Sequence, residues 1–521
     1  MSDINHIDAS TLQRDQHFEA DIVIIGSGAG GGIAAEQFAQ AGYKVLLLEE
    51  GAWYQRQHFV MEERWAYPHL YQEGAARKTR DQAISILQGR TVGGSTTVNW
   101  TTSIRTPEPT LAFWQREFGL NFSTEQSLDP YFALAEQRLN IHSWPVPPNA
   151  NNAKLQQGCE RLGWEFTVIN RNVNACANLG YCGMGCPINA KQSMLVSTIP
   201  EAMRLGATLI SRLSVRRLHW QKDQVIGLEA VPVDQYFQPR TDIKLSFNAK
   251  HYIVAAGAIG SPALLLRSKV PNPSGRLGKH TFLHPTVISG AIFAEQIHGH
   301  RGAPQSIYSD QFVWPQDADL AGYKLEVPPI HPVLMATKLI GMADQHAALM
   351  QEFNQLQVTI ALLRDGFHLQ SQGGTVQLDS AGQPVLDYPL TDYLWQGMRR
   401  ALLSMAELQF AAGARQVMPI NHHAQLYNSW SEAKSAIAEL PLAPLQQTVV
   451  SAHVMGGCNM STSPHTGVVN QDGRHFQLTN LSVFDGSILP TSLGANPQLT
   501  IYALIWRHSQ VLIQHLQQAH T

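Results

Sequence analysis

A glycine-rich turn between two apolar runs constrains the fold of this chain more than any other feature. The strand-like run IVII leads directly into GSGAGG, which places Gly26, Gly28 and Gly31 in the spacing G-x-G-x-x-G. A helical pattern, IAAEQFAQAG, follows, and a second apolar run, KVLLL, then ends in Glu49. Strand, turn, helix and strand in this order predict a βαβ unit in a parallel sheet.

The same unit predicts a nucleotide site. Glycines at these positions let backbone N–H groups and a helix N-terminus approach a pyrophosphate, and Glu49 can accept hydrogen bonds from ribose hydroxyls. The loop GRTVGGSTTVNW suits close approach by a flat, phosphate-bearing cofactor, which favours FAD over NAD. The segment HYIVAAGAIGSPALLL predicts a buried strand, a glycine turn and a helix, although it is equally compatible with a further structural βα unit.

The region 453–507 supplies the candidate chemistry. His453 begins the segment HVMGGC, and because histidine titrates near neutral pH it is the candidate acceptor of a hydroxyl proton. Asn496 and Pro497 precede an amphipathic run, which is typical of a helix start. The partial positive charge of that start would suit a flavin edge that becomes anionic on reduction. Asp485 ends an apolar run, where its carboxylate could bind a cofactor sugar or backbone amides.

These motifs, in this order, resemble those of the glucose–methanol–choline (GMC) oxidoreductases. The resemblance runs from about residue 20 to 515 and rests on GSGAGG with LLLEEG, GRTVGGSTTVN, AAGAIGSPALLL, GRLGKHTFLHP, HVMGGC and VFDGSILPTSLGANPQLT. It implies a mixed α/β and α+β fold, with a Rossmann-like FAD-binding domain of discontinuous segments and an antiparallel-sheet substrate (cap) domain. The expected division is a polar tail (1–20), an FAD-binding domain (21–110, 190–300 and 445–521) and a cap domain (111–189 and 301–444) that includes a cysteine loop (176–186).

The resemblance also assigns roles to single residues. His453 matches the base that takes the alcohol proton, and Asn496 matches its partner at the reacting oxygen, as in the His/Asn branch of the family. Val98 stands where some relatives attach FAD through a histidine, so noncovalent FAD is expected, and His284 is expected to be structural. Val215 matches a valine that contacts adenine. The expected cofactor-binding residues are Gly26, Gly28, Gly31, Glu49, Gly93, Gly94, Ser95, Asn99, Val215, Ala256, Asp485 and Pro497.

Three of the five cysteines lie in one short segment, CANLGYCGMGC, as Cys176, Cys182 and Cys186. A disulfide is not expected in a reducing compartment, and structural zinc would need a fourth ligand. Three thiolates could hold an iron–sulfur cluster such as [3Fe–4S]. The segment resembles both the cluster segment of bacterial FAD sugar dehydrogenases and a cysteine-bearing segment of long-chain alcohol oxidases in the family. Buried thiols in a tight glycine-rich loop are the alternative, and the residues leave the choice open.

Charge and hydropathy set the remaining expectations. The net charge is −3, and without a basic run the chain is not expected to bind nucleic acid. No apolar run is long enough to span a bilayer and the N-terminus is polar, so a cytoplasmic protein is expected, with export beside a partner subunit left open.

The expected function is FAD-dependent oxidation of an apolar or long-chain alcohol by hydride transfer to flavin N5. Oxygen, a quinone or a redox protein would accept the electrons. The alternatives are an iron–sulfur sugar or polyol dehydrogenase that passes electrons to a partner, and a non-catalytic binding protein on the same fold.

Overall fold

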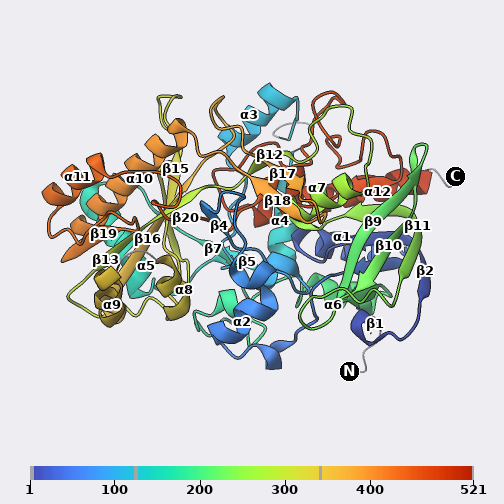
Figure 1. Ribbon diagram of the computed structural model, residues 1–521, viewed down its shortest axis with the longest axis horizontal. Coiled ribbons are helices and arrows are strands. Elements are labelled where there is room, and N and C mark those ends of the chain that lie inside the picture. Colours follow the sequence, from blue (N-terminus) through green and yellow to red (C-terminus); the bar gives the residue numbers. More distant parts are fainter. Residues whose placement is uncertain (1–4, 123–126, 340–342, 519–521) are drawn as a thin grey trace.

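The computed structural model describes residues 5–122, 127–339 and 343–518. Two large sheets, each packed against helices, occupy the two ends of an elongated molecule (Figure 1). The sheet on the right of Figure 1 contains the N-terminal strands, and the sheet on the left is built mainly from residues between 286 and 419.

The first sheet contains the predicted βαβ unit. Strand β2 (Gln16–Ile25) pairs in parallel with β3 (Val45–Leu48), and α1 (Ala29–Gln40) connects them. Residues 22–25 and 45–48 are almost fully buried, which is typical of parallel strands inside a sheet. The other strands of this sheet are β1 (His6–Asp8), β8 (Thr208–Ser211), β9 (Leu213–Gln221), β10 (Gln224–Pro232), β11 (Leu245–Val254) and β22 (Leu481–Val483).

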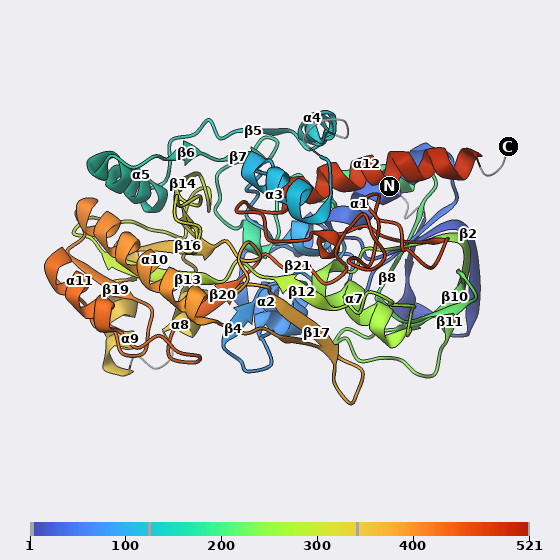
Figure 2. The ribbon, with the colours of Figure 1, turned by 90° about the horizontal axis from the view of Figure 1, so that it is seen from above.

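Segments that are far apart in the sequence complete this sheet. β2 pairs with β11 and β11 pairs with β22, both in parallel, so strands from the beginning, middle and end of the chain lie side by side. Helix α12 (Gln498–Gln518) packs against α1 and α4, as Figure 2 shows along its upper edge. The prediction of a Rossmann-like domain assembled from discontinuous segments is confirmed.

The second sheet is mostly antiparallel, as predicted. Alternate residues of β16 (Leu356–Leu363) point to opposite faces: Ala361 and Leu363 pack towards α10 (Asp392–Ala411), whereas Ile360 and Leu362 belong to a second apolar cluster and also border the large cavity described below. The strands around β16 are β4 (Ile84–Ile86), β6 (Thr167–Val168), β13 (Thr286–Ile292), β14 (Ile307–Phe312), β15 (Tyr323–Glu326), β19 (Gln416–Pro419) and β20 (Val449–Ser451).

Two small sheets and the remaining helices lie around and between these large sheets. The small sheets contain β12 (Lys279–Phe282), β17 (Gly374–Leu378), β18 (Pro384–Asp387) and β21 (Met455–Gly456) in one, and β5 (Ile141–Ser143) and β7 (Asn170–Asn172) in the other. The remaining helices are α2 (Glu63–Leu70), α3 (Glu108–Phe118), α4 (Asp129–Arg138), α5 (Ala150–Leu162), α6 (Thr198–Arg204), α7 (Gly257–Arg267), α8 (Pro332–Lys338), α9 (Ala343–Gln351) and α11 (Trp430–Glu439).

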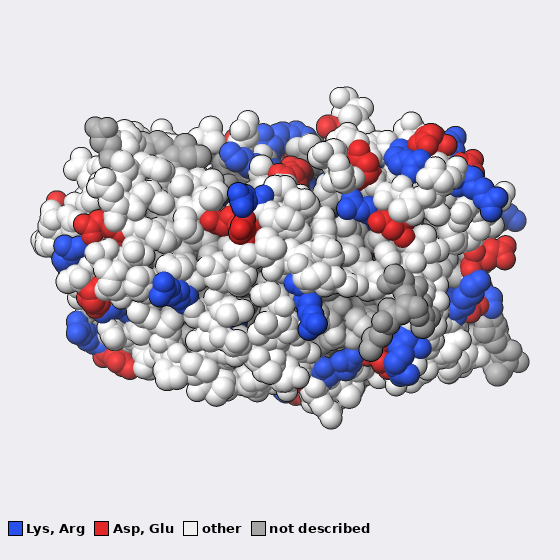
Figure 3. Space-filling model, turned by 90° about the horizontal axis from the view of Figure 1, so that it is seen from below, with Lys and Arg blue, Asp and Glu red and all other residues white. Residues whose placement is uncertain are grey.

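The predicted polar tail contributes to the first sheet where the structure describes it, because β1 and the first residues of β2 fall within 1–20. The other boundaries of the predicted domains stay a proposal. Acidic and basic side chains are interspersed on the face in Figure 3, so that face lacks a continuous basic surface. Among the helices of the described residues, none combines the length and apolar character needed to cross a membrane.

Candidate functional site

A cavity of about 740 Å³ brings most of the predicted site residues together. The turn after β2, the loop at residues 87–102, the start of α7 and several C-terminal segments form its wall. Two predicted cofactor-binding residues, Gly31 and Gly93, are not part of that wall. The predicted residues that line the cavity are Gly26, Gly28, Glu49, Gly94, Ser95, Asn99, Val215, Ala256, Asp485, Pro497, His453 and Asn496.

The glycine turn is required by close backbone packing. Gly26 has a φ of +104°, and a Cβ atom there would lie 2.2 Å from the carbonyl oxygen of Ala255 at the end of β11. A Cβ atom on Gly31 would lie 1.8 Å from the carbonyl oxygen of Gly26, so Gly31 lets α1 pack against the turn instead of lining the cavity. Gly94 approaches the turn from the opposite side, where its Cβ atom would come within 2.8 Å of the Gly28 Cα atom.

Glu49 stabilises this turn through its carboxylate. It accepts hydrogen bonds from the Ser27 N–H (3.0 Å), the Ser27 hydroxyl (2.6 Å) and the Gly51 N–H (2.8 Å). Burial raises the pKa of Glu49. The Ser27 hydroxyl accepts from the Gly93 N–H (3.0 Å), which links the turn to the next loop. The neighbouring Glu50 also lines the cavity, and the sequence interpretation missed both Ser27 and Glu50.

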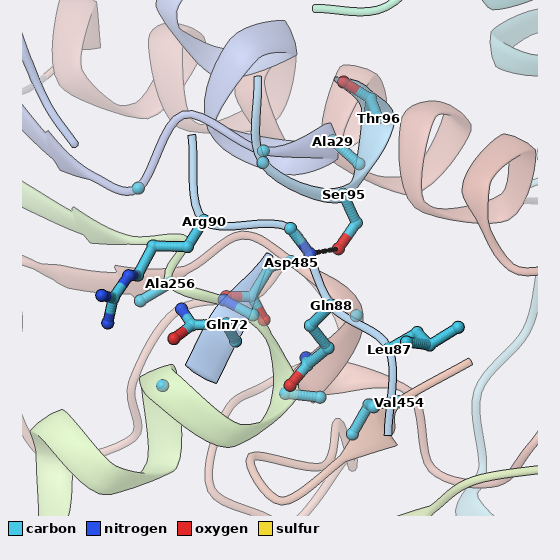
Figure 4. A pocket seen from close by; sticks show the side chains of 18 of the residues that line it. Ala29, Gln72, Leu87, Gln88, Arg90, Ser95, Thr96, Ala256, Val454 and Asp485 are labelled. Atoms are coloured by element: carbon cyan, nitrogen blue, oxygen red, sulfur yellow. Dashed lines mark hydrogen bonds between the residues drawn. The ribbon is translucent and has the colours of Figure 1, made fainter. Parts of the chain in front are cut away.

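The loop at residues 87–102 crosses the cavity wall. The Ser95 hydroxyl accepts a hydrogen bond from the Gly89 N–H at 3.0 Å, drawn as a dashed line in Figure 4. The Asn99 side chain donates to Gln498 in the first turn of α12 at 2.6 Å. The buried ammonium group of Lys191 donates to the carbonyl oxygens of Thr97 and Asn99 and also to that of Cys182. These contacts fix the loop between the turn and α12.

Asp485 binds backbone amides, which is one of the two roles expected for it. Its carboxylate accepts from the N–H groups of Gly257 (2.9 Å) and Ser487 (2.8 Å) and from the Ser261 hydroxyl (2.5 Å). Burial raises the pKa of this carboxyl group. In Figure 4, Asp485 and Ala256 lie around the same part of the cavity, although they come from separate segments. Asp485 therefore ties the start of α7 to the loop after β22.

The two predicted catalytic residues, His453 and Asn496, lie close together at another part of the cavity wall. The Asn496 Nδ2 atom lies 3.4 Å from the His453 Nε2 atom and also 3.4 Å from the Glu326 Oε2 atom. Pro497 follows directly, and α12 begins at Gln498. Glu326 comes from β15 of the second sheet and is fully buried. The sequence interpretation missed Glu326, because only the pairing of distant strands brings it here.

His284 forms a hydrogen bond with the ring of His453. The Nδ1 atoms of the two rings are 3.1 Å apart, and His284 Nε2 accepts hydrogen bonds from the N–H groups of Leu493 (3.3 Å) and Gly494 (3.2 Å). Burial and the positive charge of Lys324 lower the pKa of His453 to about 4, so the ring is neutral at pH 7. Burial and His453 also lower the pKa of His284. His284 therefore contacts the predicted catalytic histidine directly, and the structural role expected for it stays a prediction.

The three-cysteine loop gives the predicted iron–sulfur cluster no support. Cys176, Cys182 and Cys186 are free and half-buried, and no group of three or more His, Cys, Asp or Glu residues in the described ranges could hold a metal ion. The Cys182 sulfur accepts from the buried Arg171 guanidinium at 3.6 Å, whereas Cys176 packs against a small apolar cluster around Trp144. Cys182 and Cys176 thus contact different groups, although Cys182 and Cys186 lie near enough to contribute to the raised pKa of the Cys176 thiol, which is due first to burial.

The cavity fits the predicted flavin dinucleotide. Helix α1 begins at Ala29 in the cavity wall, and Gly28 at its N-cap has no side chain, so the N–H groups of the first turn can bind a pyrophosphate. At the other part of the wall, Glu326 Oε1 and Asn496 Oδ1 are buried and have no hydrogen-bond partner among the described residues. Such atoms are expected to meet a polar ligand.

Comparisons with known proteins agree with this geometry. Family models described as GMC oxidoreductase match residues 67–286 and 370–504. A long-chain-alcohol oxidase of Arabidopsis thaliana is 27% identical over 94% of this chain and 68% of its own length. An uncharacterised GMC-type oxidoreductase of Mycobacterium tuberculosis is 30% identical over 93% of this chain and 74% of its own. A formate oxidase structure from Aspergillus oryzae superimposes with a TM-score of 0.71 at 15% identity, covering 98% of this chain and 100% of that one.

Proposed function

The chain belongs to the GMC oxidoreductase family, and on that premise we propose that it oxidises an apolar, long-chain alcohol with noncovalent FAD in the cavity. As a member it is an FAD-dependent oxidoreductase that acts on CH–OH groups. The observation that carries the proposal is the meeting of His453 and Asn496 in the wall of the cavity that also contains the dinucleotide-type turn.

Two observations support an apolar substrate. The cavity wall includes apolar side chains from the second sheet and from the segment after β20, namely Ile360, Leu362, Val450 and Val454. The long-chain-alcohol oxidases of Arabidopsis thaliana resemble this chain over nearly all of its length. The same relatives support molecular oxygen as the electron acceptor.

Different parts of the cavity wall would hold different parts of FAD. The turn at residues 26–30 would bind the pyrophosphate, and Val215 would contact the adenine. The start of α12 at Pro497 would place the positive end of a helix beside the flavin ring. Val98 offers no nucleophile for covalent attachment. When bound, FAD supplies the acceptor for the hydride that leaves the alcohol carbon.

The chain's own residues orient the alcohol. His453 and Asn496 would contact its oxygen, and the apolar wall would exclude water from the reacting centre. This orientation should raise the rate of hydride transfer, because the carbon that loses the hydride must face the flavin ring.

A spectroscopic titration tests the proposed function. Acid precipitation should release FAD into the supernatant, and anaerobic mixing with primary alcohols should bleach the flavin band with a second-order rate constant that rises with chain length. His453→Ala should keep FAD and lose roughly 10²-fold or more in the rate of flavin reduction, because a contact to the substrate oxygen is lost. His465→Ala is the matched control, since His465 is exposed and outside the cavity wall. Faster reduction by sugars than by long-chain alcohols would refute the proposed substrate class, and purification without flavin would favour a binding protein.

A further inference from the structure

The hydrogen bonds of His284 determine where its proton lies. Its Nε2 atom accepts from two backbone N–H groups, those of Leu493 at 3.3 Å and Gly494 at 3.2 Å. A neutral imidazole has one N–H group and one lone pair. Because Nε2 supplies the lone pair, the proton of His284 is on Nδ1.

This assignment determines the tautomer of His453 as well. The His284 Nδ1–H group points at His453 Nδ1, 3.1 Å away, so His453 Nδ1 must be the acceptor. A neutral His453 then carries its proton on Nε2, the atom nearest to Asn496. In this state Nε2 is a hydrogen-bond donor without a lone pair, and it cannot take a proton from a substrate hydroxyl.

The same geometry places a second donor beside the first. With a proton on Nε2, His453 and the Asn496 Nδ2 group both direct N–H bonds into the space between them, where their atoms lie 3.4 Å apart. Two donors cannot satisfy each other. An oxygen atom that borders both groups would accept from each, most favourably if it carried negative charge.

Two buried acceptor atoms without partners among the described residues remain at this site, Asn496 Oδ1 and Glu326 Oε1, and of these only the Glu326 carboxylate is basic enough to take a proton. Its Oε2 atom accepts from Gln305 at 2.6 Å and from Asn496 at 3.4 Å, whereas its buried Oε1 atom has no partner among the described residues. Leaving a buried carboxylate oxygen unpaired is unfavourable, and a substrate hydroxyl would pair it. Glu326 lines the same cavity as His453 and Asn496, so an alcohol bound there can reach it.

Burial shifts the pKa values of Glu326 and His453 in opposite directions. Burial raises the pKa of Glu326, although Lys324 on the same strand lowers it in part, and Asp310 on β14 raises it. Lys324 also forms an ion pair with Asp310. The pKa of His453 moves in the opposite direction, to about 4. Proton affinity at this site therefore shifts from the imidazole to the carboxylate.

Building on the proposed function, we propose that Glu326 accepts the hydroxyl proton of the substrate, and that His453 Nε2–H and the Asn496 amide donate to the alcohol's oxygen. In this step the alcohol O–H bond breaks, its electron pair stays on oxygen, and the proton forms a new O–H bond on the Glu326 carboxylate. The negative charge that develops on the substrate oxygen is stabilised by the two donors. Glu326 is thus a catalytic residue, and His284 is a positioning residue because it fixes the tautomer of His453.

Anaerobic rapid mixing of the FAD-loaded enzyme with 1-decanol tests the base. The rate constant of flavin reduction should fall roughly 10²–10⁴-fold in Glu326→Gln, which cannot accept the proton. It should fall by no more than about tenfold in His453→Gln, whose amide can still donate. Glu295→Gln is the control, because Glu295 is half-exposed and outside the cavity wall. The opposite order, with His453→Gln the more impaired, would overturn the proposal.

The tautomer of His453 can be measured without turnover, so this second test does not depend on an active variant. Nitrogen-15 NMR of histidine-labelled holoenzyme, with His453 assigned by its loss in His453→Gln, should show a protonated Nε2 and an unprotonated Nδ1 at neutral pH. The reverse tautomer would overturn the proposal even if Glu326→Gln loses FAD or fails to fold. If 1-decanol and other alcohols leave the wild-type flavin oxidised, the proposed function fails, and the tautomer of His453 then decides the assignment of the donor separately.

Discussion

Replacing Glu49 with glutamine tests whether this residue binds the ribose of FAD or stabilises the glycine turn of the protein itself. A ribose-binding residue would matter only when FAD is bound, whereas the structure has Glu49 accept three hydrogen bonds from Ser27 and Gly51 in the protein itself. The amide of glutamine offers one acceptor oxygen, so its NH₂ group must face one of these donors. Orienting the oxygen towards Ser27 leaves the Gly51 N–H unpaired, at 2.8 Å from a second donor.

An unsatisfied buried donor costs about 1–3 kcal/mol, and this is the expected loss of stability in Glu49→Gln. At about 2–4 °C per kcal/mol for a domain of this size, the Tm of the apoprotein should fall by several degrees. Differential scanning calorimetry of FAD-free protein measures it. Glu50→Gln is the matched control, since among the residues that the structure describes Glu50 accepts from the Ser214 hydroxyl alone. If Glu49→Gln apoprotein melts at the wild-type temperature and loses only FAD affinity, Glu49 acts on the ribose and the reasoning is refuted.

Three further predictions concern other parts of the site. Burial lowers the pKa of Lys191 from 10.5 to about 8, so the folded state loses this proton at a lower pH than the unfolded state. Denaturant unfolding should therefore show the stability of the wild type relative to Lys191→Met rising by about 3 kcal/mol between pH 8 and pH 10.5. A stability difference that stays constant over this pH range would contradict this pKa. Gly26→Ala should purify with less than about a tenth of the wild-type flavin content, because its Cβ atom would lie 2.2 Å from a carbonyl oxygen, a strain of at least about 1–3 kcal/mol; full flavin content by absorbance would show that the turn can shift. Cys182→Ser should keep its flavin spectrum and its rate of flavin reduction, because the hydroxyl can still accept from Arg171; loss of iron and acid-labile sulfide relative to the wild type would instead establish a cluster.

The sequence predicts those parts of the site that are encoded within one local segment. The glycine turn, the apolar strands beside it and the helix start after Pro497 each depend on neighbours in the chain, and the structure has each of them in place. His453 and Asn496 were predicted to act together through resemblance, and the structure brings them within 3.4 Å.

What the sequence did not predict depends on contacts between distant segments. Glu326 is an ordinary strand residue until β15 joins the sheet that faces the cavity, and no local pattern marks it. The hydrogen bonds between Glu49 and Ser27 form only when the folded turn brings the two residues together, so the sequence did not predict them. The cysteine loop shows the converse, since close spacing along the chain does not require that thiols share a partner.

The pairing of β22 with β11 has a consequence for biosynthesis. An emerging chain carries the complete βαβ unit long before residues 481–518 leave the ribosome, and until then β11 lacks the partner that carries Asp485 to the cavity wall. His453, Asn496 and Pro497 are likewise translated after β11. A chain that stops before β22 presents only part of the cavity wall, so a ribosome-stalled chain of that length should not retain flavin.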